Sequence, residues 1–326
     1  MSSVPLNPSQ IKKILVVSLT NIGDVILTLP VIDILLCDFP HAQHSLVIGP
    51  KAASLFQGHP RLKKIYIYDK HQPPFQTMYW MMELLRERFD LVIDLRNSAI
   101  PYLIFPRYRT PAEHIKKWDL HMRDKHLNRL KTVYPFISLS KERHALFIRE
   151  EDRAYIKNLI ANEIGEHQPY VVIAPGAAHP SKRWHAQGFI QLAERLAKSY
   201  KVKIALVGDE KDYAVSEQIH KSMSSPAVNL AGRTTLIQLA QLMNGASLVV
   251  SNDSAPMHLA SYLNIPVLAI FGKASDPVRY GPWSEVSHFL QSSSQQKEEE
   301  RSIESVSAAS VFQCVQFDGK RFFFRR

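Results

Sequence analysis

Residues 246–272 read ASLVVSNDSAPMHLASYLNIPVLAIFG, the pattern of a buried strand, a polar turn, the start of a helix and a second buried strand. In an open parallel sheet, ligands bind beyond the carboxyl ends of the strands, and the backbone N–H groups at a helix start favour an anion. The turn at Asn252, Asp253 and Ser254 therefore predicts a phosphate site. The same side chains could simply cap the helix, and the turn alone does not decide between the two interpretations.

A second junction between a strand and a turn lies near the N-terminus. Residues 14–19 (ILVVSL) have the pattern of a buried strand, and TNIGDVILTLP follows at 20–30. Gly23 permits a tight turn, and Asp24 begins the next helix, where the helix dipole favours a carboxylate. Asp24 is thus either an ordinary helix-start residue or a base at the carboxyl edge of a sheet. This segment contains a single glycine, which disfavours a dinucleotide-binding G-x-G-x-x-G loop.

A third junction is YVVIAPGAAHPSKRW at residues 170–184, where a buried strand runs into a turn and a helix follows from about Ala186. Lys182 and Arg183 lie at the same edge as the 252 turn if the two strands share one parallel sheet. A basic pair on a loop is usually only solvated. Beside a helix start, however, two cations suit a diphosphate.

Together these junctions resemble the heptosyltransferase group of inverting glycosyltransferases (glycosyltransferase family 9), bacterial enzymes that add ADP-activated heptose to the lipopolysaccharide inner core. The matching motifs are NIGDV (21–25) with LP (29–30), PGA (175–177) with KRW (182–184), LAGRTT (230–235), NDS (252–254), MHLA (257–260) and GPW (281–283). They occur in order over most of residues 12–285. The resemblance implies an α/β fold of GT-B type, with two facing Rossmann-like domains that each contain a parallel sheet.

The apolar pattern agrees with two α/β domains, which is also what 326 residues favour. The expected strands are 14–19, 45–48, 64–68, 90–94, 170–174, 203–207, 247–251 and 266–270. A charged helical stretch at 150–160 marks the boundary between the two domains. The resemblance implies an acceptor-binding domain, expected at 1–150, and a nucleotide-sugar-binding domain, expected at 151–326. The resemblance implies that a last helix, expected at about 298–313, packs back on the first domain.

The resemblance also assigns roles to individual residues. Asp24 matches the general base, which would take a proton from the acceptor hydroxyl, and Lys182 matches a phosphate-neutralising lysine. The remaining donor-binding candidates are Arg183, Asp212, Asp253, Ser254, Ala255 and His258. Ser254 and Ala255 would cradle the diphosphate, and Asp212 would accept the ribose hydroxyls, although Asp209 or Glu210 could serve instead. Thr235 is expected to cap a helix beginning at Leu236.

The sequence departs from the family pattern at two places. Ala255 stands where most relatives carry glycine, and its methyl group is tolerated there if the backbone φ is negative. Lys273 and Ala274 replace a Pro-Thr pair, and Lys273 could add a cation. Both changes bear on the sugar preference more than on the fold.

Charge is unevenly distributed along the chain, whose formal net charge is +10. Residues 107–149 contain eleven Lys or Arg against four acidic residues, which gives this segment a charge of +7. An acceptor loop near a membrane or a phosphorylated glycolipid would have this composition. Nucleic acid is the competing partner, but no nucleic-acid-binding module accompanies the charge, so an anionic lipopolysaccharide precursor is favoured. A solvated surface without a partner is the third interpretation.

Several patterns are absent from the sequence. It has no signal segment and no apolar run of about 18–20 residues, so we expect a cytoplasmic protein with at most peripheral contact to the inner membrane. Its two cysteines lack zinc-site spacing, and neither H-E-x-x-H nor Asp-x-Asp occurs, so we expect catalysis without a metal or other cofactor.

These observations together predict an inverting, metal-independent glycosyltransferase that moves heptose from ADP-heptose to a lipopolysaccharide inner-core acceptor. A relative with another nucleotide-sugar donor, a nucleotide-sugar epimerase and a non-catalytic binding relative are the alternatives.

Overall fold

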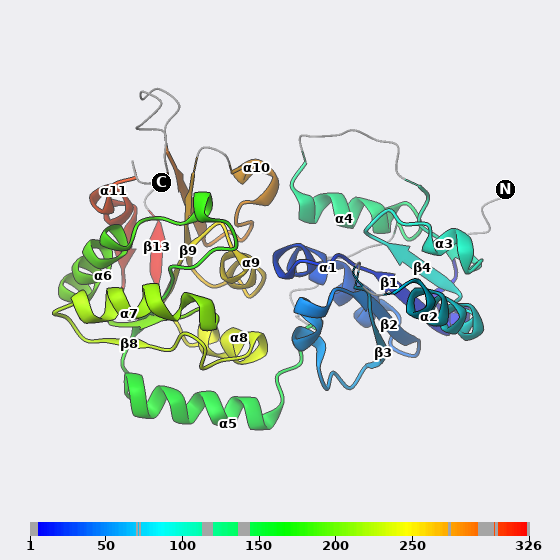
Figure 1. Cartoon of the computed structure of the whole chain (residues 1–326), viewed down its shortest axis with the longest axis horizontal. Coiled ribbons are helices and arrows are strands. Elements are labelled where there is room, and N and C mark those ends of the chain that lie inside the picture. Colours follow the sequence, from blue (N-terminus) through cyan, green and yellow to red (C-terminus); the bar gives the residue numbers. More distant parts are fainter. Residues whose placement is uncertain are drawn as a thin grey trace. The chain divides into compact units, whose positions relative to one another are not determined.

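The computed structural model in Figure 1 describes residues 6–69, 71, 73–112, 120–135, 144–272, 275–292, 303 and 306–324. The chain divides into two compact units, Met1–Phe147 and Ile148–Arg326. Each unit is built around its own parallel sheet.

The N-terminal unit contains a five-stranded sheet in the order β3-β2-β1-β4-β5. Its strands are β1 (Lys13–Val17), β2 (Gln43–Ile48), β3 (Leu62–Ile67), β4 (Leu91–Asp94) and β5 (Tyr108–Arg109). Its helices are η1 (Pro8–Gln10), α1 (Ile22–Asp38), η2 (Pro50–Phe56), α2 (Pro74–Glu87), α3 (Ile100–Leu103) and α4 (Met122–Lys131). Because the strand order reverses between β1 and β4, the topological switch point, where ligands bind in such sheets, lies beside the loop that leads to α1.

The C-terminal unit contains a six-stranded parallel sheet in the order β11-β10-β9-β6-β7-β8. Its strands are β6 (Tyr170–Ala174), β7 (Lys203–Leu206), β8 (Ala227–Asn229), β9 (Leu248–Asn252), β10 (Val267–Phe271) and β11 (Ser287–Gln291). Its helices are α5 (Glu150–Leu159), η3 (Ile160–Ile164), η4 (Pro180–Lys182), α6 (Ala186–Tyr200), η5 (Glu210–Asp212), α7 (Tyr213–Ser222), α8 (Leu236–Asn244), α9 (Ala255–Tyr262), α10 (Pro277–Tyr280) and α11 (Ala308–Gln313). This is the Rossmann strand order, and its switch point lies between β6 and β9.

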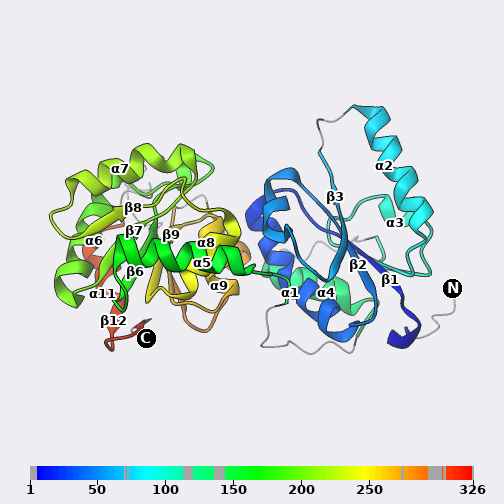
Figure 2. The same ribbon diagram turned by 90° about the horizontal axis from the view of Figure 1, so that it is seen from below.

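The central strands are continuous apolar runs because a parallel sheet is covered on both faces. Every residue of β6, β9 and β10 is buried. Helix α6 places Phe189, Leu192 and Leu196 on one side, where they pack on the sheet. Figures 1 and 2 show helices beside both sheets. All eight expected strands are present, whereas the edge strands β5, β8 and β11 were missed because they lack a continuous buried run.

Of the last helix, expected at about 298–313, the structure describes α11 over Ala308–Gln313. Ala308 and Val311 of α11 belong to the apolar core of the C-terminal unit, where α11 packs against α6. The expected packing of this helix on the first domain stays a prediction. A hairpin of β12 (Val315–Phe317) and β13 (Phe322–Phe324) follows, and the Phe322 ring lies 5.2 Å from that of Tyr200. Aromatic packing within the C-terminal unit thus holds this hairpin in place.

Part of the basic segment 107–149 forms a helix where the sequence analysis expected an acceptor loop. Its residues 122–131 form α4, which packs on α1 and buries His126 and Arg129. The Arg129 guanidinium donates from Nε to the Asp94 carbonyl at 2.8 Å, so part of the basic charge supports the fold. Residues 113–119 and 136–143 of this segment lie outside the described residues. Within the described part of the chain, no helix is long and apolar enough to cross a membrane.

Candidate functional site

The end of β9 is tied to the loop after β6 by a buried amide. The Oδ1 atom of Asn252 accepts from the Trp184 backbone N–H at 3.0 Å, and its Nδ2 donates to the Pro175 carbonyl at 2.8 Å. Both loops leave the carboxyl ends of neighbouring strands at the switch point. The Asn252 side chain therefore fixes the two loops relative to each other and does not cap α9.

An ion pair joins the same two loops. The Nζ atom of Lys182 lies 2.7 Å from Oδ2 of Asp253, whose side chain is only 6% exposed, whereas that of Lys182 is 41% exposed. The sequence placed both residues at one sheet edge, and the structure brings them into contact. Lys182 thereby presents a cation beside the N-terminus of α9, where anions are favoured.

The start of α9 is not capped by the polar turn that precedes it. Ser254 is the N-cap residue, but its hydroxyl lies 3.0 Å from Oγ of Ser251, and no side-chain hydrogen bond caps α9 within the described residues. The alternative in which this turn serves only as a helix cap is therefore wrong. Ala255 opens the helix without a positive φ, so its methyl group is accommodated. Lys273 and Ala274 lie outside the described residues.

His258 lies one turn further along α9 and is buried. Its ring stacks on Trp283 with 5.9 Å between centroids. The Trp283 backbone N–H also donates to Oγ of Ser261 at 2.6 Å. These contacts join the GPW motif to α9, so the observed role of the His258 ring is to hold this helix against the segment after α10.

Arg183 and Asp212 lie on the β7 side of the same edge. The Nε atom of Arg183 donates to the Ala177 carbonyl at 2.9 Å, and its charge acts on the Asp212 carboxylate. This carboxylate occupies the space above Gly176, where a Cβ would lie 2.1 Å from its Oδ1. Burial, followed by the neighbouring charge of Asp209, raises the pKa of Asp212. Asp212 also accepts from the Asp209 N–H at 3.2 Å in a capping box, so part of its role is local.

Thr235 takes the position expected for it. It is the N-cap of α8, which begins at Leu236, and it forms a reciprocal capping box with Gln238. This expectation is confirmed.

In the N-terminal unit, Asp24 lies in the first turn of α1, which follows β1 at the switch point. The Asn21 side chain donates from Nδ2 to Oδ2 of Asp24 at 3.0 Å, and the carboxylate is half-buried. Asn21 is the N-cap residue but makes no side-chain cap bond. Asp24 is therefore held by a neighbour at a sheet edge and is still partly accessible.

Asp94 is a second carboxylate at this edge that the sequence analysis missed. It ends β4, and its carboxylate accepts from the backbone N–H groups of Arg96 at 3.0 Å and Ser98 at 2.6 Å. Burial raises the pKa of Asp94, and these hydrogen bonds oppose the shift. The signal was an aspartate at the end of the apolar run LVID. Its bonds show that it shapes the loop between β4 and α3.

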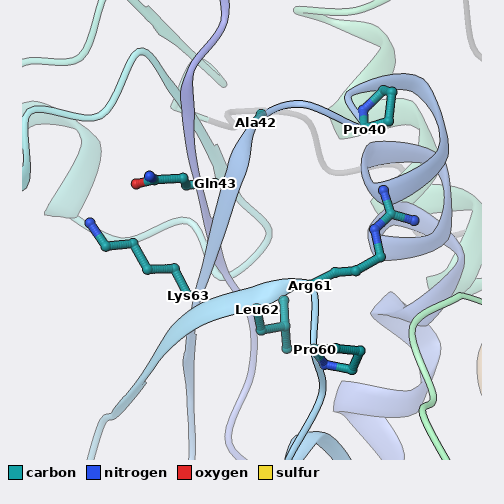
Figure 3. Close-up of a pocket in the computed structure, with 7 residues that line it drawn as sticks. All are labelled: Pro40, Ala42, Gln43, Pro60, Arg61, Leu62 and Lys63. Carbon is teal, nitrogen blue, oxygen red and sulfur yellow. The ribbon is translucent and has the colours of Figure 1, made fainter.

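A separate hollow of about 330 Å³ lies at the opposite edge of the N-terminal sheet (Figure 3). Its lining includes Gln43 and Leu62, the first residues of β2 and β3. Figure 3 shows Arg61 reaching toward α1, where its guanidinium bonds to the Leu36 carbonyl. Because this hollow is at the amino edge, it does not adjoin Asp24.

The model of glycosyltransferase family 9 (heptosyltransferase) matches residues 134–309, more than half of the chain. The chain belongs to this family. It is accordingly a glycosyltransferase, and the matched range includes every candidate residue of the C-terminal unit.

Individual relatives extend the similarity of this family 9 protein to the N-terminal unit. The lipopolysaccharide heptosyltransferase 3 of Escherichia coli is 25% identical over 287 residues, which cover 80% of this chain and 84% of the relative. The structure of a family 9 glycosyl transferase from Veillonella parvula superposes with a TM-score of 0.77 at 23% identity, covering 92% and 94% of the two chains. The structure of E. coli heptosyltransferase WaaC with ADP gives 0.69 at 18% identity, covering 92% and 98%. The fold is of GT-B type.

Proposed function

We propose that this family 9 glycosyltransferase transfers heptose from ADP-heptose to a lipopolysaccharide inner-core acceptor, with inversion at the anomeric carbon and without a metal. The observation that carries the proposal is the position of Lys182 beside the start of α9, held there by Asp253. A lysine and a helix N-terminus together form a site for a diphosphate. The names of similar proteins, among them a lipopolysaccharide heptosyltransferase and a heptosyltransferase solved with ADP, support this donor and acceptor.

In this proposal the diphosphate binds at the backbone N–H groups of Ser254 and Ala255. Lys182 neutralises it, and the Asp253 carboxylate holds the lysine in position beside the start of α9. Arg183 adds a second cation from the same loop. Asp212 accepts the hydroxyls of the nucleotide ribose, and His258 supports the site by fixing α9 through its contact with Trp283.

Asp24 is the proposed general base. The acceptor hydroxyl loses its proton to the Asp24 carboxylate as its oxygen attacks the anomeric carbon, and the bond from that carbon to the ADP oxygen breaks. Because Asn21 donates to Oδ2, the other carboxylate oxygen can take the proton. The departing diphosphate gains negative charge, which cations stabilise, so no second carboxylic acid is needed to protonate it.

The acceptor is proposed to be an anionic lipopolysaccharide precursor, attracted in part by the basic residues of segment 107–149. The cytoplasmic location and the peripheral contact with the inner membrane expected from the sequence belong to the same proposal. The epimerase alternative is no longer favoured, because the matched family consists of glycosyltransferases.

The first test is titration calorimetry of ADP, UDP and GDP against the full-length protein in the presence of a chelator. Tighter binding of ADP supports the ADP-linked donor and a diphosphate site without metal. A preference for UDP or GDP would mean that this protein uses another nucleotide-sugar donor. Nucleotide binding that disappears with the chelator would reject a diphosphate site without metal. Transfer of heptose from ADP-heptose to a core acceptor then distinguishes an enzyme from a relative that only binds.

A further inference from the structure

Helix α2 has an apolar face toward solvent. Its inner side buries Trp80 and Leu84 in the core of the N-terminal unit. Its outer side exposes five large apolar side chains, which recur at helical spacing: Phe75, Met78, Tyr79, Met82 and Leu85. A surface helix ordinarily turns polar residues outward, so α2 departs from that pattern.

The segment around α3 extends this exposed apolar surface. Ile100 and Ile104 share a core cluster with Trp80 and Leu84 of α2, and the two helices lie side by side in Figures 1 and 2. Phe105 is 79% exposed and has a φ of 49°, a conformation that bulky residues rarely adopt. Its neighbours Tyr102 and Leu103 are also exposed.

These two segments hold most of the exposed large apolar side chains. Of fifteen within the described residues, eight belong to α2 and to residues 102–105. We call these eight the apolar platform: Phe75, Met78, Tyr79, Met82, Leu85, Tyr102, Leu103 and Phe105. Apolar surface gathered in this way is typical of an interaction site.

The exposed charges at the C-terminal end of α2 are positive. The acidic residues of α2 are neutralised, since Glu83 pairs with Lys64, and Glu87 pairs with Lys13 and Lys63 at 3.0 Å each. Arg86 and Arg88 are exposed, and neither has an acidic partner within the described residues. An apolar helix face bordered by arginines complements a surface that is apolar inside and anionic at its boundary.

We propose that the apolar platform docks on an anionic lipid bilayer, with its apolar side chains in the headgroup–acyl boundary and Arg86 and Arg88 at the headgroups. Helix α2 follows β3 and α3 follows β4, so the platform starts at the carboxyl edge that also holds Asp24. A lipid-anchored acceptor would therefore be presented close to this edge. The docking itself does not depend on the proposed sugar transfer.

The test is flotation of the full-length protein with vesicles of phosphatidylcholine alone or with an equal part of phosphatidylglycerol. The test variant is Met78→Gln with Met82→Gln, whose side chains are 63% and 44% exposed. The matched control is Val278→Gln with Phe323→Gln, at 65% and 46% exposure in the C-terminal unit. We expect wild type and control to float with the anionic vesicles. The test variant should bind these vesicles at least about tenfold more weakly. Arg86→Gln with Arg88→Gln should weaken binding to the anionic vesicles alone.

Failure of the wild type to bind anionic vesicles, or equal binding by the test variant and the control, would overturn the proposal. So would a dimer of the wild type in sedimentation that the test variant abolishes without any vesicle binding, because a second copy would then cover the apolar platform. ADP titration of the same preparations separates this result from the proposed function. Vesicle binding by a protein that fails to bind ADP would leave the docking surface intact and reject the donor site.

Discussion

Lys182 and Asp253 form an ion pair of 2.7 Å that connects the loop after β6 to the start of α9. The two residues are far apart in the sequence and meet because β6 and β9 are neighbours in the sheet. Since the Asp253 carboxylate is nearly buried, Lys182 also compensates a charge that would otherwise be costly. The geometry thus gives Lys182 two roles, one as the partner of Asp253 and one in the proposed diphosphate site.

Replacing Lys182 should weaken both donor binding and transfer. We expect Lys182→Ala to reduce ADP affinity by about tenfold to a hundredfold, because a charge-assisted contact to the diphosphate is lost. Calorimetry with ADP measures this, and Lys211→Ala, an exposed lysine on the next loop, is the control. Equal ADP affinity in the two variants would exclude Lys182 from the diphosphate site.

Asp24→Asn should separate chemistry from donor binding. The amide cannot accept the hydroxyl proton, so we expect kcat to fall by about 10²–10⁴ while ADP affinity stays near that of the wild type. Asp124→Asn is the matched control, since Asp124 also lies in the first turn of a helix of the N-terminal unit. Wild-type turnover by Asp24→Asn would rule out this residue as the base.

Gly176→Ala tests the placement of Asp212. The added Cβ would lie 2.1 Å from Oδ1 of the carboxylate, so we expect a loss of about 1–3 kcal/mol in the free energy of unfolding. Combining it with Asp212→Ala removes the clashing atoms and should restore part of this loss. A denaturant titration of both single variants and the double variant measures the coupling, and strictly additive effects would contradict this contact.

Acid should destabilise the N-terminal unit through His126. Burial, followed by the charges of Lys125, Arg129 and His121, lowers the pKa of His126 to about 3. Neither of its ring nitrogens has a hydrogen-bond partner within the described residues. The unfolded chain binds a proton near the ordinary histidine pKa of about 6.5 and the folded one does not, so stability falls as pH drops from that value toward about 3.

We therefore expect His126→Leu to show a smaller loss of unfolding free energy between pH 7 and pH 5 than the wild type. Denaturant titrations at both pH values measure the difference. His41→Leu, at an exposed position, should keep the wild-type pH dependence. The same pH dependence in all three proteins would show that His126 does not control acid stability.

Much of the fold was predictable because central parallel strands are long apolar runs that any covering helices must bury. The helices beginning at Ala186 and at Leu236 were likewise placed by their start signals. The α4 helix and the packing of α11 were not predicted. Each helix has few buried residues, and these are buried by contacts with α1 and α6, which the local sequence does not show. The solvent-facing apolar side of α2 was also missed, since a sequence does not say which of two apolar faces is covered.

The sequence by itself determined the alternation of strands and helices, the polar turns at the strand ends and the family motifs, all of which depend on neighbours along the chain. Only the tertiary structure decided that Lys182 pairs with Asp253, that Asn252 ties two loops together without capping α9, and that Asp212 lies over Gly176. The physical reason is the strand order. Contacts between loops depend on which strands are adjacent in the sheet. The sequence near each loop is compatible with several hydrogen-bond partners, and the strand order decides which of them come within reach.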